Sequence, residues 1–168
     1  MDSTWTTSVW KQYGAALAML EDAITRCPDH LWSSVVWHDD EDVRYGHVWF
    51  VAYHTLFWLD LFLTGSQEGF APPPPFIRGV LPEHPYTKGQ LLSYLADCRQ
   101  RGQAIIAALT DEQAQRRCVF AWMDLSFLEL QLYSMRHVQE HAAQLSLALG
   151  QQHVSGFDWI AQAPDIDS

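Results

Sequence analysis

The amino-acid sequence predicts an all-α protein that folds as a four-helix bundle with one long crossover connection. Four long stretches carry apolar side chains at the three- and four-residue spacing of a packed helix. The segments between them show no convincing strand pattern. A proline-rich segment in the middle of the chain is too long for a tight link between helices, so we expect it to cross over the outside of the bundle.

The first two helices are bounded by residues that stop helices. Apolar residues recur over Trp5–Arg26, and Pro28 ends this helix because proline lacks a backbone N–H. The polar segment 37–42 is predicted to be a loop, although the stretch between the helices could instead hide a small helix. The second helix is expected over Val43–Leu63, with Gly65 as its stop. Its apolar residues occupy nearly all sides, so it should be the most buried element.

The crossover and the third helix follow. Gly65–Pro85 contains four consecutive prolines, which prevent a helix. Thr87 and Gln90 have the spacing of a capping box, in which two side chains cap the free N–H groups of a helix start. Apolar residues continue this third helix to Leu109.

Two further capping boxes organise the C-terminal part of the chain. The box Thr110–Gln113 predicts a short turn before a linker, Arg116–Met123. The box Ser126–Glu129 opens the fourth helix, which is expected to end at Gly150. The tail 151–168 contains large apolar residues and is expected to be packed against the bundle or partly ordered.

Length and composition favour one domain, 1–168, and exclude several classes of protein. Of the 168 residues, 48% are hydrophobic and 13% aromatic, which excludes intrinsic disorder. Acidic residues outnumber Lys and Arg by 20 to 10, giving a formal charge of −10. With no run of basic residues, the chain is not expected to bind nucleic acid or anionic membranes.

The cysteines and the hydropathy pattern predict a cytoplasmic protein. The three cysteines, Cys27, Cys98 and Cys118, are odd in number and widely spaced, which fits a reducing compartment rather than a disulfide framework. The N-terminus has no signal-peptide pattern. The most apolar stretch, Val48–Leu63, is shorter than the ~20 residues that span a bilayer.

Two histidines in the fourth helix are spaced for metal binding. His137 and His141 are one turn apart, so their imidazoles project from the same side of the helix. Such a pair is a standard way for a helix to hold one divalent metal ion. On spacing alone, two hydrogen-bonded histidines at the edge of the core are an equally good interpretation.

A third histidine, in the second helix, favours the metal site. On a helical wheel His54 is surrounded by large apolar residues, and burying an unpartnered imidazole there costs about 1 kcal/mol or more. A metal ion shared with His137 and His141 removes this cost. Three protein nitrogens and an open position are the pattern of a catalytic site, whereas structural sites normally have four ligands.

The other histidines fit this site less well. His47 lies on nearly the same face as His54, but a separation of seven positions spans ~10.5 Å of helix. We expect His47 at the mouth of the bundle, solvated or hydrogen-bonded. The other four are expected on the surface: His30, His38, His84 and His153.

The segments Tyr53–Asp60 and Met135–Leu145 resemble two motifs of the DinB-like superfamily. Proteins of that superfamily are four-helix bundles in which one His of the second helix and two of the last long helix form a metal triad. The resemblance covers nearly the whole chain, and it implies that His54, His137 and His141 bind nickel, zinc or iron. It also implies a homodimer and, from some relatives, the use of a low-molecular-weight thiol. The family name points to DNA, which the negative charge of this chain argues against.

Together these observations predict a divalent-metal-dependent enzyme with an open three-histidine site that acts on a small molecule. Its reaction is that of a hydrolase or of a thiol-dependent S-transferase, which the sequence does not separate. The alternative is a non-catalytic helical bundle, a small-molecule-binding or stress-related protein whose aromatic residues line a passive pocket.

Three further residues are candidates for assisting roles. Gln144 is placed to orient a metal ligand or a bound water molecule, and Tyr53 and Tyr133 could donate to a substrate oxygen. For Gln144 a solvated or interhelical amide is an equally good interpretation, whereas aromatic packing is the default for Tyr53 and Tyr133. Glu140 is expected on a solvated face, and Asp60 has no assigned role.

Overall fold

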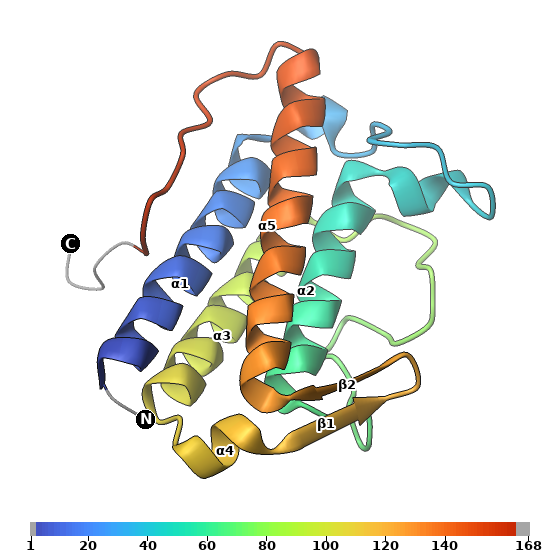
Figure 1. Cartoon of the computed structure of the whole chain (residues 1–168). Helices are drawn as coiled ribbons and strands as arrows, with labels where there is room; N and C mark the ends of the chain where they lie inside the picture. The colour runs from blue at the N-terminus through green and yellow to red at the C-terminus, as the bar shows by residue number, and fades with distance from the viewer. Residues whose placement is uncertain (1–2, 164–168) are drawn as a thin grey trace.

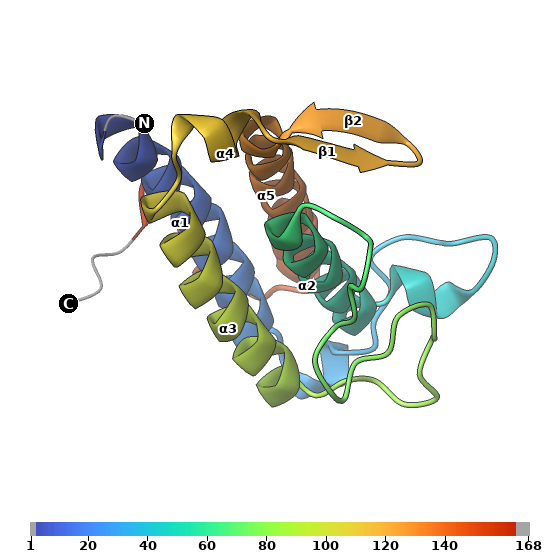
Figure 2. The same ribbon diagram turned by 90° about the horizontal axis from the view of Figure 1, so that it is seen from below.

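The computed structural model describes residues 3–163 and consists mainly of four long helices (Figure 1). They are α1 (Ser3–Arg26), α2 (Val48–Thr64), α3 (Lys88–Ala107) and α5 (Phe127–Gln151). Seen from below, the four helices lie side by side (Figure 2), and their buried residues form a common core. Helix α1 packs against α3 and α5, and α2 packs against the same two helices. The predicted four-helix bundle is confirmed; the end of the predicted tail, 164–168, lies outside the described residues.

The crossover is also confirmed, and the direction of the helices explains it. Figure 1 shows α2 and α3 running in the same direction, so the chain leaves α2 at one end of the bundle and has to return to the other end before α3 begins. Residues 65–87 make this return on the outside. Gly65 caps α2 in the left-handed conformation with φ 73°, and its N–H donates to the carbonyl of Leu61, as expected for a glycine stop.

The capping boxes form as predicted and set the starts of three helices. The Thr87 hydroxyl accepts from the N–H of Gln90, whose side chain caps Thr87 in return. The same reciprocal pair opens the short helix α4 (Asp111–Gln115) and helix α5. Helix α1 ends at Arg26, two residues before Pro28.

The start of the second helix was predicted too early. Residues Val43–Gly46 form a 3-10 helix, η2, and α2 begins at Val48. An antiparallel bridge pairs Val35 with His47, and this extended backbone separates η2 from α2. With a second 3-10 helix, η1 (Asp29–Leu31), the connection contains two small helices, while segment 37–42 between them is irregular as predicted.

The predicted linker Arg116–Met123 is wrong, because most of it belongs to a β-hairpin. Strand β1 (Arg117–Phe120) pairs antiparallel with β2 (Met123–Ser126), and Phe120 faces Met123 across a two-residue loop. The strands are held because one face of β1 is buried: Cys118 and Phe120 pack into a small core at the end of the bundle. Two aromatic side chains of the hairpin contact α2: Phe120 meets Phe62, and Trp122 meets Trp58.

Helix α2 is the most buried of the four long helices, as its sequence predicts. Twelve of its 17 residues are buried. The tail after α5 runs back along α1, where the N–H of Ala163 donates to the carbonyl of Lys11 over 2.7 Å. Among the described residues, no helix combines the length and apolar character that a membrane span requires.

Candidate metal centre

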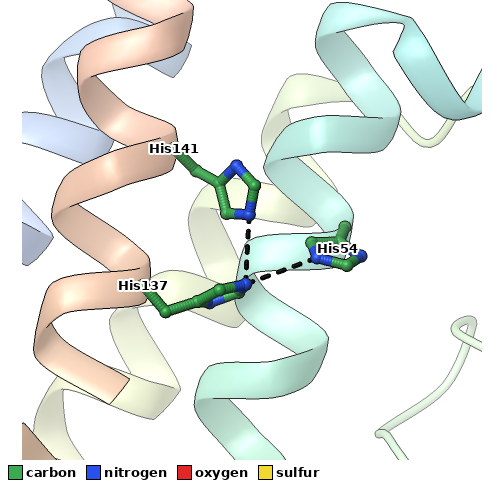
Figure 3. A group of neighbouring side chains, drawn as sticks. All are labelled: His54, His137 and His141. Carbon is green, nitrogen blue, oxygen red and sulfur yellow. Dashed lines mark hydrogen bonds between the residues drawn. The ribbon is translucent and has the colours of Figure 1, made fainter. Parts of the chain in front are cut away.

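The three predicted histidines come together between two helices. His54 projects from α2 and His137 and His141 project from α5 toward it (Figure 3). The Nε2 atom of His137 lies 3.3 Å from Nε2 of His54 and 3.0 Å from Nε2 of His141. Each residue offers a potential ligand atom, and these atoms all lie within 4.8 Å of one another.

Aromatic packing holds the rings in place. The His54 ring contacts Phe50 on one side and Trp58 on the other, at centroid distances of 6.4 and 6.1 Å. The His137 ring meets Phe62 edge-on at 6.4 Å. All three imidazoles are partly buried. The cluster therefore sits at the edge of the core and remains partly accessible.

The hydrogen bond between His141 and Gln144 leaves the Nε2 lone pair of His141 free to face the other histidines. Nδ1 of His141 lies 2.8 Å from Oε1 of Gln144, and an amide oxygen only accepts, so Nδ1 carries the proton and Nε2 has a free lone pair. A single proton on Nε2 of His137 can be aimed at His141 or at His54, but not at both. In the absence of a metal ion, one of the two Nε2–Nε2 contacts of His137 therefore has no hydrogen atom between its nitrogens. A cation between the rings would interact favourably with all three nitrogens.

The distances between the nitrogens fit a shared ion. Imidazole nitrogens bind zinc at about 2.0–2.1 Å, so two of them on one ion lie about 2.8–3.4 Å apart for bond angles from about 90° to tetrahedral. Both Nε2 separations measured from His137 fall in this range. The donor set and its spacing therefore match a divalent metal ion.

Burial keeps these imidazoles in the neutral form that binds metals. Desolvation, together with repulsion from the neighbouring imidazoles, lowers the pKa of His54 to about 4 and that of His137 to about 3. Burial also lowers the pKa of His141, although its hydrogen bond with Gln144 opposes the shift. All three side chains are therefore ready to bind a cation at neutral pH.

Two cavities meet at the histidine cluster. The first, which we call the aromatic cavity, has a volume of about 190 Å³ and is lined by Tyr45, Phe50, Tyr53, His54, Phe57, Trp58, Gly79, Val80 and Leu81. The second, the hairpin cavity, has a volume of about 400 Å³ and is lined by His54, Trp58, Phe62, Trp122, Tyr133 and His137. His54 and Trp58 border both cavities, so the cluster is open to molecules from two sides.

The assisting candidates also lie near the cluster. Gln144 contacts His141 directly. Tyr53 lines the aromatic cavity, and its hydroxyl donates to the carbonyl of Ile77 in the crossover over 3.4 Å. Tyr133 lines the hairpin cavity. His47 caps the start of α2 and lines neither cavity, and the remaining histidines are exposed as predicted.

Sequence reasoning missed two aromatic residues of the site. Trp37, in the connection before α2, stacks on the His141 ring at a centroid distance of 6.2 Å. Trp122, in the hairpin loop, meets Trp58 edge-on at 5.5 Å and lines the hairpin cavity. Both residues lie outside the helices, and the periodicity of a sequence does not predict where such segments lie relative to the helices.

Sequence reasoning also missed a polar network on another face of α2. The buried carboxylate of Asp60 accepts from the Tyr94 hydroxyl over 2.6 Å and from Nη2 of Arg101 over 2.8 Å. This network borders a cavity of about 550 Å³ that is larger than those at the cluster but contains none of the three histidines. We regard it as a link between α2 and α3.

The cysteines contribute no nucleophile to the cluster. Cys27, Cys98 and Cys118 are all buried free thiols. Burial raises the pKa of Cys27 to about 11 and that of Cys98 to about 12, so both remain protonated at neutral pH. None of the three lines either cavity at the cluster.

Comparisons with known proteins identify the family. The sequence model of the DinB superfamily matches residues 12–145, which include all three histidines. The crystal structure of a DinB-like protein of Bacillus subtilis, YjoA, is similar with a TM-score of 0.63, covering 94% of this chain and 99% of that one. The two sequences are 12% identical, so this likeness shows a common fold. No curated protein matches the chain. The chain belongs to the DinB superfamily, whose members are commonly metal-binding proteins.

Proposed function

We propose that the protein is a divalent-metal-dependent enzyme acting on a small molecule, with His54, His137 and His141 as its metal ligands. The observation that carries this proposal is the convergence of three neutral imidazoles, with Nε2 atoms 3.0 and 3.3 Å apart and one ring fixed by Gln144. Membership of a superfamily that commonly binds metals supports it. Imidazole ligands suit nickel, zinc and iron, and we propose one of these.

The reaction would use the open side of the three-histidine site. When bound, the ion would lower the pKa of a water molecule or a thiol so that it attacks as hydroxide or thiolate. Gln144 holds the tautomer and orientation of His141. Trp58 and Phe62 supply apolar walls of the hairpin cavity beside His54 and His137. A hydrolase and a thiol-dependent S-transferase both fit, and a thiol would have to come from a separate low-molecular-weight molecule because the protein's own cysteines are buried elsewhere.

Metal content is the direct test. Protein purified without a chelating column should contain a single divalent metal ion per chain, measured by elemental analysis. Replacing His54, His137 or His141 by Ala should abolish tight binding, while His47→Ala is the matched control and should keep it, because His47 lines neither cavity at the cluster. If His54→Ala binds metal as tightly as the parent protein, α2 supplies no ligand and the proposal fails.

Activity assays then separate the reaction classes. Metal-loaded protein is tested on a panel of esters, amides and alkylating electrophiles, with and without an added thiol. Turnover without thiol supports the hydrolase, and turnover that requires thiol supports the S-transferase. Metal binding without turnover in either assay supports the non-catalytic alternative, a small-molecule-binding bundle, which the largely apolar lining of the aromatic cavity favours.

We also propose a cytoplasmic homodimer that does not bind nucleic acid. Three free thiols fit a reducing compartment. Trp5 is 61% exposed on α1 and offers apolar surface for a symmetric contact. The formal charge of −10 would repel a phosphate backbone.

A further inference from the structure

The aromatic cavity has walls of unusually uniform chemistry. Five of its lining residues are Phe, Tyr or Trp, and successive rings of this belt contact each other: Tyr45 with Phe50 at 4.9 Å, Phe50 with Tyr53 at 5.9 Å, and Phe57 with Trp58 at 5.4 Å between centroids. Gly79, Val80 and Leu81 of the crossover close the remaining side. The lining contains no Asp, Glu, Lys or Arg, so the cavity suits a neutral apolar group.

The volume of the cavity limits the size of that group. An apolar protein cavity of about 150 Å³ holds one benzene molecule. At about 190 Å³, the aromatic cavity has room for one six-membered ring with a small substituent, but not for two fused rings with substituents. Aromatic walls favour a planar occupant, because rings pack edge-to-face or offset against it.

The position of His54 connects this cavity to the proposed reaction. His54 lines the cavity, and its Nε2 atom lies 3.3 Å from Nε2 of His137 within the cluster. A ring seated between Phe50, Phe57 and Trp58 would therefore direct a polar substituent toward the three histidines. The hairpin cavity on the other side of Trp58 stays free for the second reactant.

We propose that the aromatic cavity is the specificity pocket of the enzyme and that its substrate carries a single, uncharged aromatic ring, or an apolar group of that size, beside the reacting polar group. This inference rests on the proposed metal function, since only a bound ion makes His54 part of a reaction centre. The crossover supplies the outer wall, with Val80 half-exposed at its edge.

The first experiment tests the cavity without metal. Binding of toluene to the chelator-treated protein is followed by ligand-observed NMR. Val80→Trp should fill the mouth of the cavity and weaken toluene binding about 10- to 100-fold, the loss expected when a buried ring is excluded. Val119→Trp is the matched control, because Val119 is also exposed but lies on β1 away from the cavity lining. Equal toluene binding by the parent and Val80→Trp overturns the assignment of the cavity.

The second experiment tests the link with the cluster. Zinc-loaded protein is titrated with acetohydroxamate, benzohydroxamate and 2-naphthohydroxamate, which share one metal-binding group and differ in the attached ring. Benzohydroxamate should bind about 10- to 100-fold more tightly than acetohydroxamate, and the naphthyl compound should gain nothing further. Phe57→Ala enlarges the cavity and should shift the preference toward the naphthyl compound.

The two proposals fail in different ways. If the protein takes up zinc but binds the three hydroxamates equally, the specificity pocket is wrong while the metal centre stands. If the protein takes up none of zinc, nickel and iron, the metal function is wrong, and with it the claim about the substrate, even where toluene still binds in the cavity.

Discussion

At the scale of single residues, the hydrogen bond between Gln144 and His141 is the contact that tunes the cluster. It fixes the proton of His141 on Nδ1 and leaves Nε2 free. Gln144→Ala removes the acceptor, so metal affinity should fall about 10- to 100-fold in a competition titration with a chelating dye. Gln144→Glu keeps an acceptor and should restore binding. Gln139→Ala is the control, because Gln139 contacts Met19 of α1 instead; an equal loss in that variant would show that α5 is simply destabilised.

The lowered pKa values of the histidines predict how stability depends on pH. The pKa is about 4 for His54 and about 3 for His137 in the folded protein, against about 6.5 in the unfolded chain. Between these values the unfolded state binds more protons, so the metal-free protein should lose stability as the pH falls from about 6.5 toward 4. Urea denaturation at a series of pH values measures this slope. The slope should be smaller in His137→Phe, and an unchanged slope would contradict the assigned cause.

At the scale of elements, the Asp60 network joins α2 to α3 in the absence of a short connection between them. Asp60 is 5% exposed, and its carboxylate depends on Tyr94 and Arg101 for hydrogen bonds. Tyr94→Phe should lower the free energy of unfolding by about 1.5–3 kcal/mol, because it deprives a charged group of a donor. Tyr133→Phe, at a partly exposed tyrosine, should change it by less than about 0.5 kcal/mol. Tyr94→Phe should keep the metal content of the parent protein. A loss of metal in this variant would indicate that Asp60 belongs to the metal centre.

The helices were predictable because their ends carry local signals. Gly65 and the boxes at Thr87 and Ser126 act within one helical turn, so they can be read without knowing the fold. The hairpin was not predictable in this way. Its strands have four residues each, and its loop is Ala121–Trp122 rather than the Asn-Gly or Gly-containing pair that marks a two-residue turn. What holds it is the burial of Cys118 and Phe120 against distant helices.

The candidate site divides in the same manner. The histidines were predictable, because helical spacing places His137 and His141 on one side of their helix. His54 was predictable because a buried imidazole among apolar residues is unfavourable without a partner. The walls of the cavities were not, because Trp37, Trp122 and residues 79–81 reach the cluster only through the path of their connections.

At the scale of the whole molecule, the predicted dimer depends on α1. Light scattering should give twice the 19.3 kDa of one chain over a range of concentrations. Trp5→Glu should return the mass to that of the monomer, because a charge in an apolar contact is costly. Trp159→Glu is the control at another exposed tryptophan, in the tail. A monomer mass for the parent protein at every concentration would contradict the dimer.

The helices carry the histidines and the connections carry part of the cavity walls, and this separation has an evolutionary consequence. The three histidines stand on α2 and α5, whose packing is shared by the whole bundle, while residues 79–81 and Trp122 belong to the crossover and the hairpin. Mutations in these two connections can reshape the cavities without moving the nitrogens of the cluster. A descendant of this chain could therefore acquire a new substrate by exchanging a surface segment while inheriting the reaction centre intact, and the same exchange offers a route to its redesign.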